Sequence, residues 1–139
     1  MSAEPIRADV LRREAASLVE RLRLWTPARW AAIAPPLGTR AEVVHHLAQR
    51  FADDAATLEG SPHRVLPRLD SDLALADQLA VTADDLIRAG PPPDVAAAAA
   101  AHLLVHRADL LGDAVPPGLA GALDVDDVEA TGRAACRGC

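Results

Sequence analysis

The sequence contains no lysine and no tyrosine, and it has one phenylalanine and two tryptophans among its 139 residues. All 14 basic residues are therefore arginine, so no lysine is available to form a Schiff base. Aromatic side chains, which strands prefer, are scarce, whereas alanine, leucine and valine supply nearly all of the hydrophobic half of the chain. Because alanine and leucine favour helices, the composition predicts an all-α protein.

Cysteine is nearly absent as well, since Cys136 and Cys139 at the end of the chain are the sole pair. Two cysteines three residues apart cannot cross-link a fold, which indicates a reducing compartment. A Cys-x-x-Cys pair can bind metal or undergo redox cycling, but such pairs usually lie within a fold. The terminal position favours a frayed tail over a role as accessory ligand or resolving thiol.

Charge and hydropathy exclude several classes of function. The formal net charge is -6 and no basic patch is interleaved with aromatic residues, so nucleic-acid binding is not expected. The longest apolar run, Val95–Ala101, is far too short to cross a bilayer, and the N-terminus lacks the apolar stretch of a signal peptide. We therefore expect a cytoplasmic protein with no nucleic-acid or membrane partner, and the enzyme hypothesis developed below adds a small-molecule substrate.

Proline and glycine divide the chain into four predicted helices, at about residues 6–24, 39–58, 70–89 and 94–111. The second has the clearest start, because Thr39 and Glu42 have the spacing of a capping box. Thr26 followed by Pro27 predicts a further short turn of helix between the first two segments.

Short connections favour antiparallel neighbours, so the pattern predicts an up-down antiparallel four-helix bundle over residues 1–116. Residues 117–139 are predicted to form a short irregular C-terminal extension, in which Val125–Ala135 adds one short acidic helix. No internal repeat and no second domain is evident in the sequence.

Two histidines, His102 and His106, are the most informative residues for function, in the stretch HLLVHRADL. Residues four apart on a helix project from the same face, one turn apart. Imidazole is a common ligand for zinc and nickel, so two rings at this spacing can share one ion. Leu103 and Leu110 lie on the same helical stripe as the two histidines, which favours histidines that face the interior of the bundle. The alternative is a chance pair of exposed histidines on an alanine-rich helix.

A third ligand is available from the second predicted helix, which carries His45 and His46. Three protein ligands with one open position form the catalytic kind of zinc site. On a helical wheel His46 lies toward Val43 and Arg50, whereas His45 points further toward solvent. Periodicity therefore favours His46, and the alternative is that both histidines are surface residues at the rim of the bundle.

The stretch TPARWAAIAPPLGTRAEVVHHLAQ resembles the first half of the DinB-like family, and most of all the branch with mycothiol-dependent maleylpyruvate isomerases and related thiol transferases. The shared features are a tryptophan in a short turn, a proline-rich loop, a threonine-capped helix and a histidine before Leu-Ala, here Trp30, Pro35-Pro36, Thr39 and His46-Leu47-Ala48. The stretch HLLVHRADLLGD resembles the last bundle helix of that family, where a His or Glu and a His four residues later complete a metal triad. The resemblance covers roughly residues 6–116.

This resemblance implies a four-helix bundle in which His46, His102 and His106 hold one divalent ion. Zinc is the first expectation, because histidine nitrogen suits it, and nickel accepts the same donors. In the family the ion activates a thiol or a water, and the thiol comes from a low-molecular-weight cofactor such as mycothiol or bacillithiol. The implied activity is that of a metal-dependent thiol transferase or isomerase.

Two neighbours of the histidine pair have an open interpretation. Asp109, three residues after His106, could hydrogen-bond a ligand ring or a substrate, or it could be a solvated surface residue. Arg107 could meet an anionic substrate, although a solvated helix surface is the favoured interpretation for this residue.

The other function class is a non-catalytic bundle that serves as an interaction or dimerisation module. Small side chains let another helix approach closely, so a homodimer could form on the alanine-rich face of the fourth predicted helix. This hypothesis predicts no metal and a specific partner, whereas the enzyme hypothesis predicts about one bound ion per chain.

Overall fold

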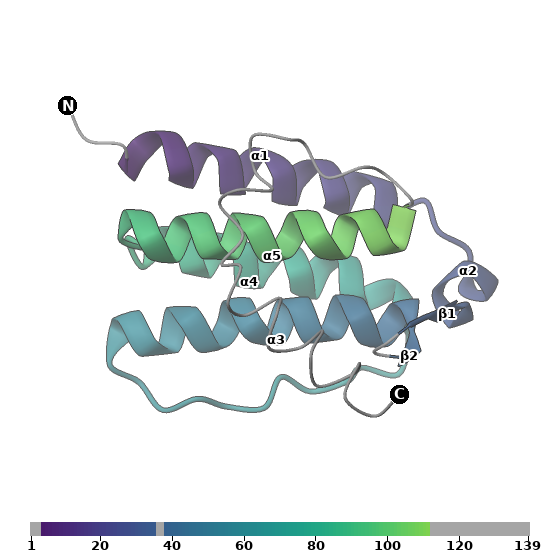
Figure 1. Ribbon diagram of the computed structural model, residues 1–139. Coiled ribbons are helices and arrows are strands. Elements are labelled where there is room, and N and C mark those ends of the chain that lie inside the picture. The colour runs from purple at the N-terminus through teal and green to yellow at the C-terminus, as the bar shows by residue number, and fades with distance from the viewer. Residues whose placement is uncertain (1–3, 36–37, 112–139) are drawn as a thin grey trace, which may run out of the picture.

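The computed structural model describes residues 4–35 and 38–111, and this part of the chain is all-α, as predicted (Figure 1). Its elements are α1 (Glu4–Leu22), α2 (Pro27–Ala31), β1 (Ile33–Ala34), β2 (Gly38–Thr39), α3 (Arg40–Glu59), the 3₁₀ helix η1 (Asp72–Ala74), α4 (Leu75–Arg88) and α5 (Pro93–Leu111). The four long helices correspond to the four predicted segments. The proposed boundary near residue 116, the helix expected at 125–135 and the two cysteines lie outside the described residues.

The helix starts that were read from the sequence are present. The backbone N–H of Glu42 donates to the hydroxyl of Thr39 at 3.2 Å, and the Glu42 carboxylate accepts from the backbone N–H of Thr39 at 3.2 Å. The Thr26 hydroxyl accepts from the backbone N–H of Arg29 at 3.3 Å, with Pro27 in the first turn. Each cap satisfies backbone donors that have no partner inside the helix, which sets where α2 and α3 begin.

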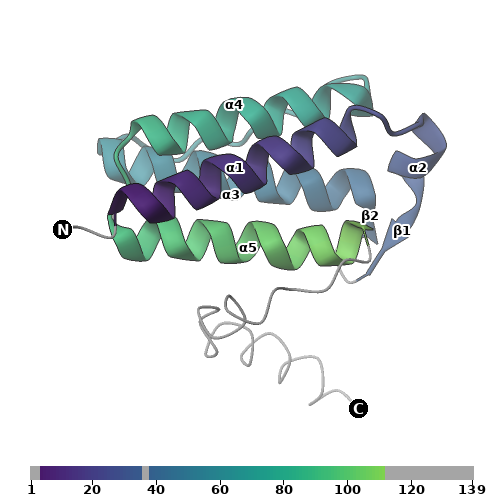
Figure 2. The same cartoon turned by 90° about the horizontal axis from the view of Figure 1, so that it is seen from above.

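The four long helices pack around one apolar core. α1 lies beside α4 and α5, and α3 lies beside the same two helices on the other side (Figures 1 and 2). The largest fully buried side chains come from all four and from α2: Leu11, Leu18, Leu22, Trp30, Val44, Leu47, Phe51, Leu75, Leu79, Leu86, Leu103 and Leu110. α3 and α5 form the smallest of the four interfaces between neighbouring helices.

The helix directions correct one expectation. α1 and α5 run one way and α3 and α4 run the other way, so α3 and α4 are parallel neighbours (Figure 1). The ion pair of Arg23 with Asp77 at 2.9 Å agrees, because it joins the end of α1 to the start of α4. The prediction of antiparallel neighbours throughout is therefore wrong, because residues 61–71, hereafter the crossing segment, return along the bundle before α4 begins.

Side chains of α3 hold the crossing segment in place. The amide of Gln49 donates to the carbonyl of Arg64 at 2.9 Å and accepts from the backbone N–H of Leu66 at 2.6 Å. Further along, the Thr57 hydroxyl and the His63 ring are hydrogen-bonded at 2.7 Å. The two bonds of Gln49 satisfy backbone groups of a segment that forms no strand, and the bond between Thr57 and His63 adds a contact between side chains, so the segment can follow α3 closely.

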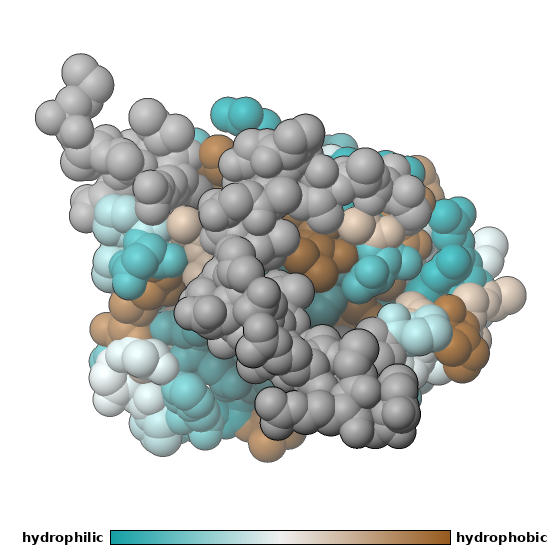
Figure 3. All heavy atoms as spheres, viewed as in Figure 1, coloured by the Kyte–Doolittle hydropathy of each residue, from teal (hydrophilic) through white to brown (hydrophobic). Residues whose placement is uncertain are grey.

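Large apolar side chains are exposed mainly in the connections between helices. The residues concerned are Leu24, Ile33, Val65, Leu69 and Leu73, together with Val81 on α4. Figure 3 shows brown atoms at the end of the molecule where Figure 1 places β1 and α2. A search of the described helices finds none that combines the length and the apolar character needed to cross a membrane.

The turn before α3 yields a prediction about glycine. Gly38 has φ +117° and a Cβ there would collide with the Glu42 carboxylate, whereas Gly60 has φ +70° and open space around it. Gly60→Ala should cost about 1 kcal/mol of backbone strain. Gly38→Ala should cost about 2 kcal/mol or more, because it also disturbs the capping box. Urea unfolding of the two variants measures the difference, and equal losses would contradict this account of the turn.

Candidate metal site

α3 carries polar side chains on two flanks, one on each side of its buried stripe. On one flank, His45 and Gln49 face the crossing segment, where both bond to its backbone. On the other flank, His46 and Arg50 turn toward α5, and Asp54 continues the row by another turn. Neighbouring residues on a helix are about 100° apart, so the two adjacent histidines belong to different flanks.

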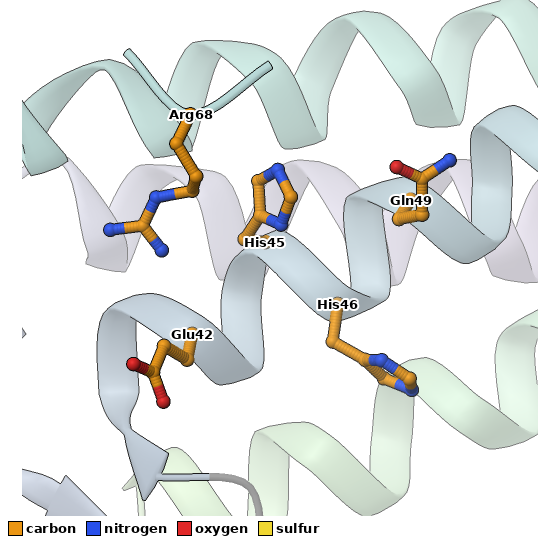
Figure 4. A pocket seen from close by; sticks show the side chains of 5 residues that line it. All are labelled: Glu42, His45, His46, Gln49 and Arg68. Atoms are coloured by element: carbon orange, nitrogen blue, oxygen red, sulfur yellow. The ribbon is translucent and has the colours of Figure 1, made fainter. Parts of the chain in front are cut away.

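His46 and His106 meet between α3 and α5. Their ring centroids are 5.8 Å apart and the rings are inclined at 82°. Two imidazoles that share one ion, each about 2.1 Å from it, have ring centres about 5 Å apart. Figure 4 shows His46 pointing toward α5, away from His45. Two residues 60 positions apart in the sequence therefore stand close to the spacing at which they can share a ligand.

The third predicted ligand, His102, lies one turn before His106 on α5 and is half-buried. The ring contact itself joins His46 and His106. In residues 4–35 and 38–111, no group of three or more His, Cys, Asp or Glu side chains is arranged to hold a metal ion. The structure thus brings two of the three predicted ligands together and places the third on the same face of α5.

The surroundings of His106 favour its neutral form. Burial lowers the pKa of the His106 imidazole, and the neighbouring His46 and Arg50 lower it further, while the carboxylate of Asp109 acts in the opposite direction. Within the described part of the chain, Nδ1 of His106 is buried and has no hydrogen-bond partner. A neutral imidazole is the form that ligates metals, and a buried ring nitrogen without a partner carries a free-energy cost that a ligand can offset.

His45 has a different environment from the one expected. It is half-buried, and its Nε2 lies 2.8 Å from the carbonyl oxygen of Leu66 in the crossing segment. The expectation that His45 points to solvent is wrong, because periodicity within α3 contains no information about a segment that packs on it from outside. His45 is occupied in holding the fold, and His46 is the histidine of α3 that faces α5.

An open pocket of about 610 Å³ adjoins His46 and is lined by Glu42, His45, His46, Gln49 and Arg68 (Figure 4). The other four side chains already have partners. Glu42 belongs to the capping box, Arg68 pairs with Asp72 at 2.8 Å, and His45 and Gln49 bond to the crossing segment. His46 therefore belongs both to the lining of this pocket and to the histidine pair.

Arg107 and Asp109 have different surroundings in the structure. Arg107 forms an ion pair with Glu14 of α1 at 2.7 Å, and both side chains are largely shielded from solvent. Neither sequence interpretation of Arg107 anticipated this link between helices. Asp109 is exposed, and its negative charge acts on the imidazole of His106. A supporting role at the histidine pair thus suits Asp109 better than Arg107.

Arg50 is the residue that the sequence analysis did not single out. It is half-buried, and among the described residues its Nε is buried without a hydrogen-bond partner. Its positive charge acts on His106 of α5 and on Asp54 of α3, which places it along the junction of these helices. The one available signal was its position four residues after His46, on the same face of the helix.

Comparison with known proteins adds no relative: no protein-family model, no curated protein and no solved structure matches this chain. The resemblance to the DinB-like family therefore stays a prediction from sequence motifs. Any function has to be argued from the residues of the site.

The pKa of His106 should respond to its neighbours with opposite signs. Removing a like charge with His46→Gln should raise this pKa, although burial should still keep it below the ordinary value. Removing the attractive carboxylate with Asp109→Asn should lower it further. Ring-proton NMR across a pH titration measures both shifts. Shifts in the same direction, or none, would contradict the arrangement described above.

Stability should depend on pH through the same imidazole. An unfolded histidine takes up a proton below about pH 6.5, whereas folded His106 takes one up only at lower pH. The unfolded state therefore binds more protons in this window, and the free energy of unfolding should decrease as the pH falls from about 6.5 toward 5. His106→Gln should flatten this slope in urea titrations. The difference between this variant and the parent reports on His106 alone, because Asp54 is present in both. The raised pKa of Asp54 has the opposite effect on the slope.

Proposed function

We propose that this protein binds one divalent metal ion between α3 and α5 and acts as a thiol-dependent transferase or isomerase on a DinB-like four-helix bundle. The observation that supports it most is the convergence of His46 and His106, which come from two different helices. The ring spacing of 5.8 Å and the inclined planes suit two imidazoles that share a ligand.

The donor set fits a borderline metal ion. Both converging groups are imidazoles, His106 is neutral, and its buried Nδ1 has no partner in the described part of the chain. Zinc and nickel both accept such donors, and zinc needs no particular arrangement beyond a tetrahedral one. His102 would complete the set by a change of side-chain rotamer, since it already occupies the same face of α5 one turn away.

A bound divalent ion would lower the pKa of a thiol from a small cofactor of the mycothiol type, so that a nucleophile is available at neutral pH. The protein's own residues supply the setting for that chemistry. His46 is exposed and adjoins an open pocket, so small molecules can reach the pair from solvent. The core behind His106 is apolar and excludes water, and the carboxylate of Asp109 adds a negative charge that acts on the imidazole.

The alternative function is an interaction or dimerisation module, which was inferred from the small residues of α5. Small residues of α5 that were expected on an open face are buried within the chain, namely Ala96, Ala99, Ala100 and Ala101. They allow α1 and α5 to approach each other closely inside the molecule. The alternative stays a prediction without a supporting contact in the described residues.

Metal binding tests the proposal directly. Calorimetric titration of the chelator-treated protein with Zn²⁺ should give about one site per chain. His46→Ala and His106→Ala should each weaken binding by about 100-fold or more, since even the outer partners of metal ligands contribute about 10- to 100-fold. His102→Ala should have a similar effect if it supplies the third nitrogen.

His45→Ala is the matched control, because it removes the neighbouring imidazole on the other flank of α3. This variant should lose stability through its bond to Leu66 and should keep the metal affinity of the parent. If His46→Ala and His106→Ala bind Zn²⁺ as the parent does, the site is wrong. If His102→Ala alone does so, the third ligand is wrong.

A further inference from the structure

The guanidinium of Arg50 is a half-buried cation that has no counter-ion among the residues that the structure describes. In the part of the chain that the structure describes, Arg50 takes part in no hydrogen bond and no ion pair, and its Nε is shielded from solvent. Removing a charge from water without a partner costs free energy, so buried arginines are normally paired. The described residues provide no such anionic partner for Arg50.

Three other arginines in the described part of the chain each have a contact. Arg107 pairs with Glu14 on α1, and Arg68 of the crossing segment pairs with Asp72 of η1. Arg40 lies over the ring of Trp25, with its guanidinium carbon 5.5 Å from the ring centre. Each of these contacts stabilises the packing of one element on another, and Arg50 has no such contact among the described residues.

The nearest acidic group on its own helix does not pair with it either. Asp54 lies one turn further along α3, and the two charges act on each other without an ion pair between them in the described residues. Burial raises the pKa of the Asp54 carboxyl, whereas the positive charge of Arg50 lowers it. The acid of Asp53 is held by the amide of Gln49 at 2.9 Å, on the other side of the helix.

Arg50 is also placed next to the histidine pair. It follows His46 by four residues on the same flank of α3, which corresponds to a rise of about 6 Å. Its charge acts on His106 across the junction with α5. An anion held by Arg50 would therefore lie on the same flank of α3 as His46 and at the same junction with α5.

We propose that Arg50 is a specificity-determining residue that binds the oxyanion group, a carboxylate or a phosphate, of the small molecule that enters the site. The planar fork of a guanidinium matches either group with two parallel hydrogen bonds, which its two terminal nitrogens can donate while Nε stays buried. The role of the anion rests on the function proposed above, whereas its binding by Arg50 can be measured without any metal.

The experiment uses the full-length, metal-free protein and follows the arginine Nε–Hε signals by ¹⁵N NMR. Acetate and inorganic phosphate are titrated separately, with chloride keeping the ionic strength constant because screening alone shifts signals. The Arg50 signal should show a saturable shift in at least one of the two titrations, and the titration that saturates at lower concentration identifies the type of oxyanion.

Three variants test whether Arg50 is the residue that binds the anion. Arg50→Gln should weaken the anion response of the His106 ring signals by about tenfold or more, as expected for the loss of a charged hydrogen-bond donor. Arg50→Lys keeps the charge without the fork and should fall between the parent and Arg50→Gln. Arg13→Gln removes an exposed arginine of α1, across the core from α3, and should leave the response unchanged.

The two proposals fail in distinguishable ways. An Arg50 signal that shifts with neither anion, or an anion response that survives Arg50→Gln, would overturn the role of Arg50. So would an Arg50 signal that moves on Asp54→Asn and not on addition of either anion, since Arg50 would then be an internal ion-pair partner. Zn²⁺ titration of Arg50→Gln should still give about one ion per chain with an affinity no weaker than that of the parent, because the variant removes a positive charge that repels the cation. Loss of metal binding in the histidine variants is measured independently.

Discussion

The site depends on one geometric constraint, the rotation of about 100° per residue along α3. This rotation separates two adjacent histidines so that His45 bonds to the crossing segment at 2.8 Å while His46 meets His106. The apolar stripe between the two flanks, centred on Leu47 and Phe51, fixes the rotation of α3 about its axis. The packing of the core therefore also determines where the candidate site lies.

The junction of α3 and α5 differs from the other helix interfaces. It is the smallest of the four, and polar groups with incomplete partners collect along it: the buried Nδ1 of His106 and the buried Nε of Arg50. Such groups cost stability in a folded protein. Binding of a ligand by either group would offset that cost.

The local parts of the fold and of the site could be predicted from the sequence. The capping box of Thr39 and Glu42 involves atoms only three residues apart, so its spacing alone was sufficient. In the same way, His102 and His106 share a face of α5 because four residues make about one turn. The choice of His46 came from the period of the apolar stripe, although the surroundings expected for His45 were wrong.

Composition and periodicity by themselves determined that this chain is helical, which stretches form its four long helices, and which residues share a face. Only the tertiary structure decided that α3 and α4 are parallel, that Arg107 pairs with Glu14, and that Arg50 has no counter-ion among the described residues. Helix formation depends on hydrogen bonds and side-chain spacing within a few residues. The path of the crossing segment depends instead on the amide of Gln49 bonding to the backbone of Leu66, and such side-chain to backbone bonds between distant positions follow no period in the sequence.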